Sequence, residues 1–210
     1  MTASVIVSLR VGASPLRAFE AFTDDIGLWW VQNPLFMLTP RGDGALRFEP
    51  GEGGRLVSTL ADGAEFEVGR ITVWQPGERL ALSWRQASFA PGQTTELDVR
   101  FEAVGDETRV TVEHRGWDTI PQKHVARHGF DLLLFQRRQV DHWRALLASL
   151  KARMRSGGEG CGRGRSGNGS GSPCAELMCQ MAEKRESWRV AHAPTPSSPR
   201  RRMGADFKEN

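Results

Sequence analysis

Residues 122–155 read QKHVARHGFDLLLFQRRQVDHWRALLASLKARMR, and this stretch decides the fold. It contains no proline, and after Gly129 it contains no glycine. Apolar or amphipathic residues recur at alternating steps of three and four, which places them on one stripe of a helix. The stripe consists of Leu133, Gln136, Val140, Trp143, Leu147, Leu150 and Met154. Gly157 and Gly158 end the pattern, as expected at a helix C-terminus. Burying the stripe contributes roughly 10 kcal/mol at about 2 kcal/mol per side chain, so another layer of structure must cover it.

The chain before this stretch reads as a series of short strands. Apolar and polar residues alternate in seven runs, at residues 5–11, 45–49, 55–60, 66–73, 80–84, 97–101 and 110–114. Asp62-Gly63 is typical of a hairpin turn. The alternation slips by one residue near Gly69, which predicts a bulge that bends the sheet. Because short turns join the last six runs, we expect an antiparallel meander with one apolar face.

Two short helices are expected after the first strand. Ser14 and Pro15 provide an N-cap and a proline at the first helical position, and a second brief turn spans residues 26–30. The sheet has one apolar face and the long helix has one apolar stripe, and packing the two against each other buries both. The sequence therefore predicts a two-layer α+β domain with about seven strands, two short helices and a long C-terminal helix.

The composition changes near Arg155. Residues 156–173 contain eight glycines among 18 residues, and they contain no apolar residue larger than Cys161. Such a segment cannot offset its ordering entropy by burial. We therefore expect one domain at residues 1–155 and a disordered tail, rich in Gly, Ser, Arg and Pro, at residues 156–210.

The basic charge of the chain also belongs to the tail. Nine of the 28 Lys and Arg residues and six of the 25 Asp and Glu residues follow Arg155, so the tail carries 9 − 6 = +3 and the domain is neutral. The cluster at residues 200–202 is three arginines, which we interpret as a solvated end. The charge therefore gives no reason to expect a nucleic acid partner for the domain.

Cysteine usage and the N-terminus limit the class of protein further. All three cysteines, Cys161, Cys174 and Cys179, lie in the tail, and their spacing matches neither a disulfide framework nor a paired-thiolate zinc site. The N-terminus runs straight into strand-like alternation without the pattern of a signal peptide. No segment approaches 18 consecutive apolar residues. The sequence predicts a cytoplasmic protein without a membrane span.

Several motifs between residues 3 and 153 occur in a characteristic order. They are Ser14-Pro15 with Phe19, Phe22 and Thr23-Asp24; Trp29-Trp30; Gly53-Gly54-Arg55; the run from Trp74 to Trp84; and the run from Thr108 to His114. Together they resemble the START-like (SRPBCC) superfamily, within its branch related to the activator of the Hsp90 ATPase. The resemblance implies the helix-grip fold, in which a curved antiparallel sheet wraps around the long helix and leaves a cavity between them.

The same resemblance implies three functions that the sequence leaves open. The first is binding of a small apolar or aromatic molecule in the cavity. The second is an enzyme, similar to a polyketide cyclase or a hydrolase, that uses the same cavity. The third is a protein-binding module similar to the Hsp90 activator, with a chaperone as its partner. Whether the protein is an enzyme stays undecided, since no nucleophile elbow, phosphate loop or dinucleotide fingerprint occurs. We expect no cofactor.

The candidate ligand-binding residues are mostly aromatic, as is common in ligand sites. They are Trp29, Trp30, Trp84, His114, Trp117, Gln136, Val140 and Trp143. His114 continues the inward phase of Val110 and Val112, so its imidazole is the candidate acid or base. Trp117 lies in a lid-like segment, residues 117–128, and is the candidate gate. The alternative interpretation is that the tryptophans pack the core and that His114 is hydrogen-bonded at the rim.

Two further histidines in the lid-like segment have the spacing of metal ligands. His124 and His128 are four residues apart and can share a helix face. No Glu stands between them, however, and no third ligand is evident. We therefore expect no metal site.

Overall fold

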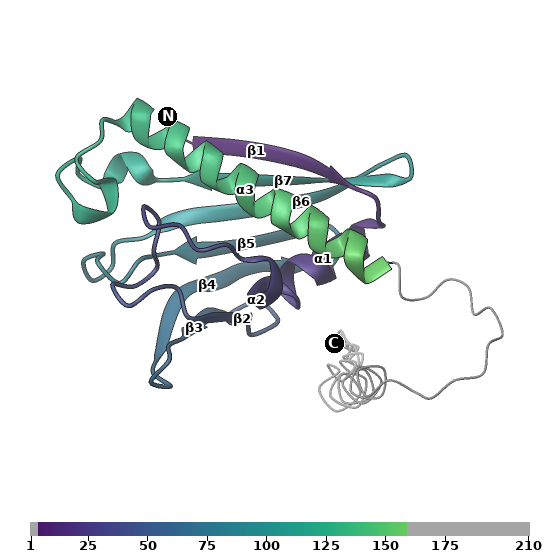
Figure 1. Cartoon of the computed structure of the whole chain (residues 1–210), viewed down its shortest axis with the longest axis horizontal. Coiled ribbons are helices and arrows are strands. Elements are labelled where there is room, and N and C mark those ends of the chain that lie inside the picture. Colours follow the sequence, from purple (N-terminus) through teal and green to yellow (C-terminus); the bar gives the residue numbers. More distant parts are fainter. Residues whose placement is uncertain (1–3, 159–210) are drawn as a thin grey trace, which may run out of the picture. The chain divides into compact units, whose positions relative to one another are not determined.

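The computed structural model describes residues 4–158 as one curved antiparallel sheet with three α-helices. The elements are β1 (Ser4–Val11), α1 (Pro15–Thr23), α2 (Ile26–Trp29), β2 (Ala45–Phe48), β3 (Arg55–Thr59), β4 (Glu65–Gln75), β5 (Arg79–Trp84), β6 (Thr95–Val104), β7 (Glu107–Arg115) and α3 (Leu132–Gly158). Two short 3₁₀ helices, η1 (Trp117–Thr119) and η2 (Val125–Arg127), lie between β7 and α3. Figure 1 shows α3 lying across the sheet, with α1 and α2 beside it. This is the α+β helix-grip fold that the sequence predicts.

The seven strands follow the order β1-β7-β6-β5-β4-β3-β2. From β2 to β7, each strand therefore pairs with the strand that comes next in the sequence. The meander is confirmed, and β1 completes the sheet by pairing antiparallel with β7. The predicted bulge is present, because Leu56 pairs with Gly69 and Val57 pairs with Glu67, which leaves Val68 as an extra residue. Only glycine fits beside this bulge, since a Cβ on Gly69 would lie 1.8 Å from the Ser83 carbonyl oxygen.

The long helix begins ten residues later than the start of the stretch that predicts it. The Asp131 side chain accepts a hydrogen bond from the Leu134 N–H at 2.8 Å, which caps the first turn. Residues 122–131 instead form η2 and loops, with His128 (φ 51°) and Gly129 (φ 73°) in the left-handed region. At the other end α3 continues to Gly158, so residues 156–158 belong to the helix. The rest of the predicted tail lies outside the described residues.

The buried face of α3 is rotated from the predicted stripe in its first half. The prediction is wrong for Leu133, which is 61% exposed, while Gln136 and Val140 are only half-buried. The buried residues in this half are Phe135, Gln139, His142 and Trp143. Counting back from Trp143 by four instead of three gives Gln139 and then Phe135. Both counts are compatible with 3.6 residues per turn, so the periodicity alone does not choose between them.

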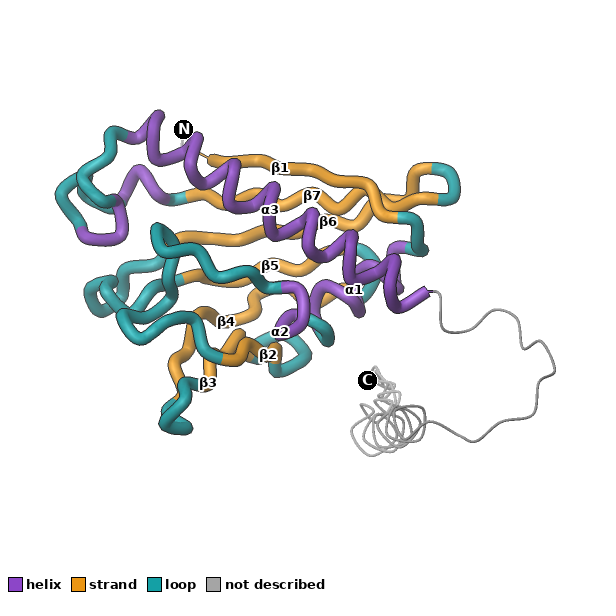
Figure 2. Tube along the Cα trace, viewed as in Figure 1, coloured by secondary structure: helices purple, strands orange, loops and turns teal. Residues whose placement is uncertain are grey.

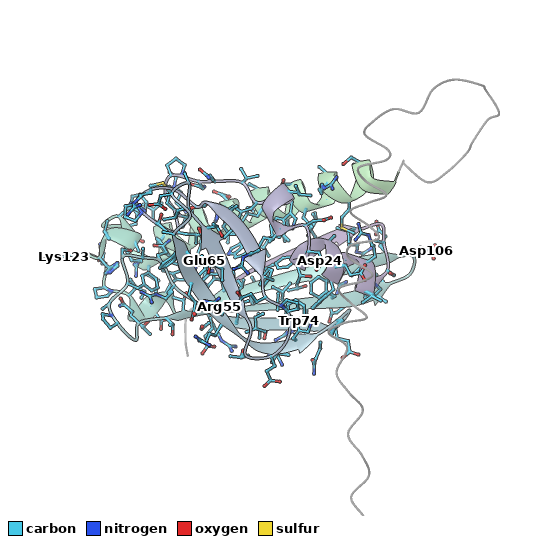
Figure 3. The ribbon with its side chains drawn as sticks, turned by 90° about the horizontal axis from the view of Figure 1, so that it is seen from below. Asp24, Arg55, Glu65, Trp74, Asp106 and Lys123 are labelled. Carbon is cyan, nitrogen blue, oxygen red and sulfur yellow. The ribbon has the colours of Figure 1, made fainter. Side chains whose placement is uncertain are left out.

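The buried side chains form two clusters. The main core lies between the sheet and the helices and includes Phe22, Leu80, Val99, Phe101, Leu146 and Leu150. The end cluster, as we call it, consists of Phe36, Phe89, Trp117, Ile120, Ala126 and Phe135. It is built from three loops and the first turn of α3, at the end of the sheet where Figure 2 shows loops gathered around the start of that helix. In Figure 3, Lys123 marks this end and Asp106, in the β6–β7 turn, marks the opposite one.

No helix within residues 4–158 is long and apolar enough to cross a membrane.

Candidate functional site

A small cavity lies where the end cluster meets the sheet and α3. Its aromatic lining consists of Trp30, Phe36, Trp84, Trp117 and Trp143. Its polar lining consists of Gln86, His114, Gln139 and His142. The cavity measures about 10 Å³, which is close to the smallest space that holds one water molecule. No charged side chain lines it.

The wall nearest the main core is made of three indole rings held in fixed positions. The ring centroid of Trp30 lies 5.8 Å from that of Trp84 and 6.3 Å from that of Trp143. The Trp30 N–H donates to Asp43 Oδ2 at 2.8 Å, and Asp43 Oδ1 accepts from the Leu38 N–H at 2.8 Å. Asp43 is 1% exposed, so a buried carboxylate orients Trp30 from behind the cavity.

The opposite wall belongs to the end cluster. The Trp117 ring packs 4.8 Å from Phe135 and 5.3 Å from His114, measured between centroids. Phe36 stacks on His142 at 4.8 Å with an interplanar angle of 19°. Because Trp117 and Phe36 come from separate segments between the regular elements, this wall depends on the packing of these segments, whereas Trp84 and Trp143 of the first wall belong to β5 and α3.

A directed chain of hydrogen bonds fixes the tautomer of His114. The Trp143 indole N–H, which can only donate, lies 3.3 Å from His114 Nδ1. His114 Nδ1 is therefore the acceptor, and Nε2 carries the hydrogen that it donates to Thr95 Oγ1 at 2.9 Å. The Thr95 hydroxyl in turn donates to the Trp84 carbonyl oxygen at 3.3 Å. Both ring nitrogens of His114 are thus engaged with protein groups.

Burial keeps both histidines of the cavity neutral. It lowers the pKa of His114 to about 3, with a further contribution from the nearby His142. It also lowers the pKa of His142 to about 4. At pH 7 the cavity therefore presents uncharged groups throughout its lining.

Two buried polar atoms of the lining have no hydrogen-bond partner among the described residues. They are Gln139 Oε1 and Trp117 Nε1. The orientation of the Gln139 amide follows from the tautomer of His114, because the amide group lies 3.4 Å from Nδ1, whose lone pair would repel the amide oxygen and is compatible with Nε2. Two residues of the lining therefore carry a buried polar atom without a partner, one an acceptor and one a donor, and such groups require an explanation.

Five of the eight residues predicted to bind a ligand line this cavity together, and three do not. The five are Trp30, Trp84, His114, Trp117 and Trp143. Gln136 and Val140 lie outside the lining because of the rotated phase of α3. Trp29 is fully buried in the main core, where its N–H donates to the Ala21 carbonyl oxygen at 3.0 Å.

Four residues of the lining are not among those predicted from the sequence: Phe36, Gln86, Gln139 and His142. For two of them the spacing in the sequence indicates a buried position. Gln139 lies four residues before Trp143, and His142 lies four residues before Leu146, so each can share a helix face with that apolar residue. Phe36 and Gln86 lie in loops, where no period assigns a side chain to one face.

The two lid histidines with metal-ligand spacing make hydrogen bonds to different loops. His124 Nε2 lies 3.1 Å from the Ser88 carbonyl oxygen, and His128 Nε2 lies 2.6 Å from that of Leu35. No group of three or more metal-ligating side chains occurs in the part of the chain that the structure describes. The two side chains thus fasten residues 117–131 to their neighbours.

Arg127 holds the same segment from inside. It is 3% exposed, and its Nη1 donates to the carbonyl oxygens of Trp117 at 3.1 Å and Ile120 at 2.9 Å. Its Nη2 donates to the Phe130 carbonyl oxygen at 3.1 Å, and its guanidinium lies 5.0 Å from the centroid of the Phe135 ring. Burial lowers the pKa of Arg127. The charge is solvated by backbone carbonyls and a ring face, and this arrangement shapes the lid.

A seven-stranded helix-grip domain with a cavity between sheet and helix defines a START-like protein. The sequence model for the family described as Activator of Hsp90 ATPase homolog 1-like protein matches residues 12–155. The chain therefore belongs to this family, within the START-like superfamily. No curated protein sequence shows a significant match to it.

Solved structures support the fold. The HSP90 activator PFC0360w from Plasmodium falciparum is similar with 19% identity and a TM-score of 0.50, over 72% of this chain and 96% of that one. Protein MLL2253 from Mesorhizobium loti is similar with 16% identity and a TM-score of 0.50, over 73% and 98%. DynU16, a protein in the dynemicin biosynthetic locus, is similar with 19% identity and a TM-score of 0.51, over 73% and 48%. At these identities the likeness concerns the fold alone.

Proposed function

We propose that this chain binds a small, mainly aromatic molecule between the sheet and α3, at the cavity walled by tryptophans. The observation that carries the proposal is the pair of unpaired polar atoms, Gln139 Oε1 and Trp117 Nε1, inside an aromatic lining. Ligand sites typically combine apolar walls with a few polar groups that fix orientation. A packed core has no need of such a pair, since each unpaired atom costs about 1–3 kcal/mol.

Binding requires the end cluster to move. The cavity of about 10 Å³ is far smaller than the roughly 150 Å³ that accommodates benzene. Trp117 and Phe36 are the rings to displace, because they come from loops that no strand pairing holds. Trp84 and Trp143 stay in place, since one belongs to a strand inside the sheet and the other to α3. The ligand therefore enters from the lid side and rests on the fixed wall.

Titration of ¹⁵N-labelled full-length protein with indole, naphthalene and 2-naphthol tests the proposal. The indole N–H signals of Trp117 and Trp143 should shift with saturation. The signal of Trp74, which packs on Phe19 at 5.1 Å in the main core, is the internal control and should not move. If no compound shifts Trp117, or if all tryptophans shift equally, the proposed site is wrong.

The acid–base role considered for His114 receives less support. Both of its nitrogens already form hydrogen bonds, and its pKa of about 3 makes it a weak base at neutral pH. A ligand would have to break the bond to Thr95 or the bond from Trp143 before it could exchange a proton with this ring. We therefore assign His114 a positioning role within the proposed binding site.

The second candidate is a protein-binding module that acts on the Hsp90 ATPase, and family membership is the observation in its favour. Adding the purified chain to Hsp90 should then raise the rate of ATP hydrolysis in a dose-dependent manner. A rate that stays unchanged at a large excess of the chain rejects this candidate and leaves the ligand-binding proposal untouched.

A further inference from the structure

The two edge strands of the sheet differ in how they are protected against pairing with another chain. At one edge, β2 is four residues long, and its Arg47 forms ion pairs with Glu49 and Glu65. Short strands and charged side chains are common ways of blocking an edge. At the other edge, β1 has eight residues, pairs with β7 without a bulge and contains no proline. Its solvent-facing side chains include a large apolar one, Ile6, which is 59% exposed.

The outer side of β1 offers backbone groups for pairing. In a strand every second residue turns its N–H and C=O toward the same side, so about four residues of β1 point away from β7. Within residues 4–158, the one backbone hydrogen bond between β1 and a residue outside the sheet runs from the Ala13 N–H to the Val11 carbonyl oxygen. Figure 1 shows β1 at the border of the sheet. This edge can therefore accept one more strand.

A line of basic side chains on α3 runs beside this edge. The basic line, as we call it, consists of Arg137, Arg144, Lys151 and Arg155. At about 100° per residue, these positions lie within about 40° of each other around the helix. The helix packs against β1, and the basic line faces that strand, because Lys151 and Arg155 share a hollow with the end of β1. The line is about 27 Å long, and so is a strand of eight residues.

Most of the positive charge of the basic line is not neutralised by the described part of the chain. Arg144 lies 3.7 Å from Asp141, whereas the other three members form no ion pair within residues 4–158. The Glu107 carboxylate also lines the hollow, and it lies 3.8 Å from Arg10. The surface beside the β1 edge therefore favours an occupant with negative charge.

The hollow between the end of β1 and the last turns of α3 leaves room for a side chain of the occupant. It measures about 160 Å³, and roughly 150 Å³ accommodates benzene. Val11 and Met154 contribute apolar lining, and a Cβ on Gly12 would meet nothing within 4 Å. Unlike the cavity walled by tryptophans, the hollow has this volume without displacement of the lid.

We propose that β1 and the basic line of α3 form a docking surface for an extended acidic segment of another protein, which adds to the sheet as an eighth strand. Backbone hydrogen bonds to β1 hold the segment. Every second side chain of the segment turns toward α3, where a carboxylate meets the basic line. A second copy of this chain is disfavoured at this edge, because pairing two β1 strands brings two basic lines to one interface.

Titration of ¹⁵N-labelled full-length protein with three matched peptides tests the docking surface. The first peptide has eight residues that alternate glutamate with threonine or valine. The second replaces each glutamate by glutamine, and the third keeps the glutamates but carries a methyl group on every backbone nitrogen. We expect the first to bind about tenfold or more tightly than the other two, since it alone offers both the charges and the backbone donors. The amide signals of β1 should shift with saturation, and those of β2, the other edge, should not.

Each of the other results overturns the proposal. If the N-methylated peptide binds as tightly as the first, charge attracts the peptide without strand addition. If the glutamine peptide binds as tightly, the basic line has no part in recognition. If no peptide binds, or if the signals of β1 stay unchanged, this edge is not a docking surface.

Variants of exposed charges locate the site on α3. Arg137→Gln combined with Lys151→Gln removes two members of the basic line and should weaken binding of the glutamate peptide about fivefold or more. Arg138→Gln is the matched control, because this exposed arginine lies about 100° or more away from the line around the helix, and it should keep the affinity. Equal affinities in all three proteins would remove the basic line from the proposal.

An eight-nucleotide single-stranded DNA separates strand addition from attraction of any polyanion. We expect it to bind more weakly than the glutamate peptide, because it has no backbone amides to pair with β1. If the DNA binds as tightly and shifts the same signals, the surface recognises negative charge alone and the assignment of a peptide is wrong. The docking surface and the cavity walled by tryptophans share no lining residue, so these results leave the ligand-binding proposal untouched.

Discussion

Lowering the pH from 7 to 5 should destabilise the domain by about 4 kcal/mol because two buried histidines must stay neutral to fold. In the unfolded chain a histidine titrates near pH 6.5. In the folded domain burial lowers the pKa of His142 to about 4 and that of His114 to about 3. Between those values and pH 6.5 the unfolded chain binds protons that the folded domain does not. Stability therefore falls as the pH drops through this window.

The magnitude follows from linkage. At pH 5 nearly every unfolded-state histidine is protonated and neither buried one is, so each contributes a loss of about 2 kcal/mol relative to pH 7. Glu49 also stabilises the domain less as the pH falls, but this loss begins at a lower pH than that of the histidines. Arg55 holds the pKa of Glu49 at about 2, so the stabilisation from that group is lost only as the pH falls below its ordinary value of 4.5. The interval from pH 7 to 5 thus isolates the histidines. With a urea slope of about 2 kcal/mol per molar, the midpoint should fall by about 2 M.

Urea unfolding followed by tryptophan fluorescence at pH 7, 6 and 5 measures this effect. His142→Phe keeps a ring against Phe36 and removes one titrating group, so its loss of stability between pH 7 and 5 should be about 2 kcal/mol smaller than that of the wild type. Gln136→Leu, a change on the same helix without a titrating group, should keep the full loss. If the wild-type midpoint is flat across this interval, or if His142→Phe follows the wild type, burial of neutral His142 is not the cause and the reasoning is refuted.

Two further predictions concern the bulge and the lid. Gly69→Ala should cost about 3 kcal/mol in urea unfolding, because its Cβ would lie 1.8 Å from the Ser83 carbonyl oxygen. Gly12→Ala, whose Cβ would meet nothing within 4 Å, should be nearly neutral, and equal costs would contradict the steric argument. Arg127→Met should weaken the lid by about 2–3 kcal/mol, seen as faster amide hydrogen exchange over residues 117–130 with unchanged exchange in β5–β7. Arg138→Met, on the exposed face of α3, should leave the lid unchanged.

The sheet and the position of His114 could be predicted because a strand has a strict period of two. In β7 the burial alternates at every residue, and Val110, Val112 and His114 all point inward as their spacing indicates. The period of a helix is about 3.6 residues, so steps of three and of four residues both stay near one face. Steps of three and four from Trp143 lead to Val140 or to Gln139, and both positions carry a residue that tolerates burial. Only contacts with the sheet and the end cluster decide, and these depend on the whole fold.

The lid could not be predicted residue by residue because its order comes from contacts between loops. Phe36 reaches the cavity from the loop before β2 and stacks on His142 of α3. Gln86 comes from the loop after β5. Neither loop has a period that assigns its side chains to a face. The sequence predicts Trp117 as a gate because it lies in the lid-like segment, residues 117–128, and its place in the cavity lining is compatible with that role.

The division into two clusters bears on how a nearly filled cavity can serve as a binding site. The strands and α3 bury the main core, and the end cluster is a separate set of buried side chains. The end cluster is held by packed rings, by Arg127 and by two histidines that hydrogen-bond to the carbonyl oxygens of neighbouring loops. Releasing it breaks these contacts without unpairing a strand, which is the condition for opening at a free energy below that of global unfolding. A ligand that replaces the rings of Trp117 and Phe36 against the fixed wall recovers the apolar burial lost on opening. The closed volume therefore measures how well the lid fills the site in the absence of a ligand, and the rings of Trp84 and Trp143 are the surface that the open site offers to a ligand.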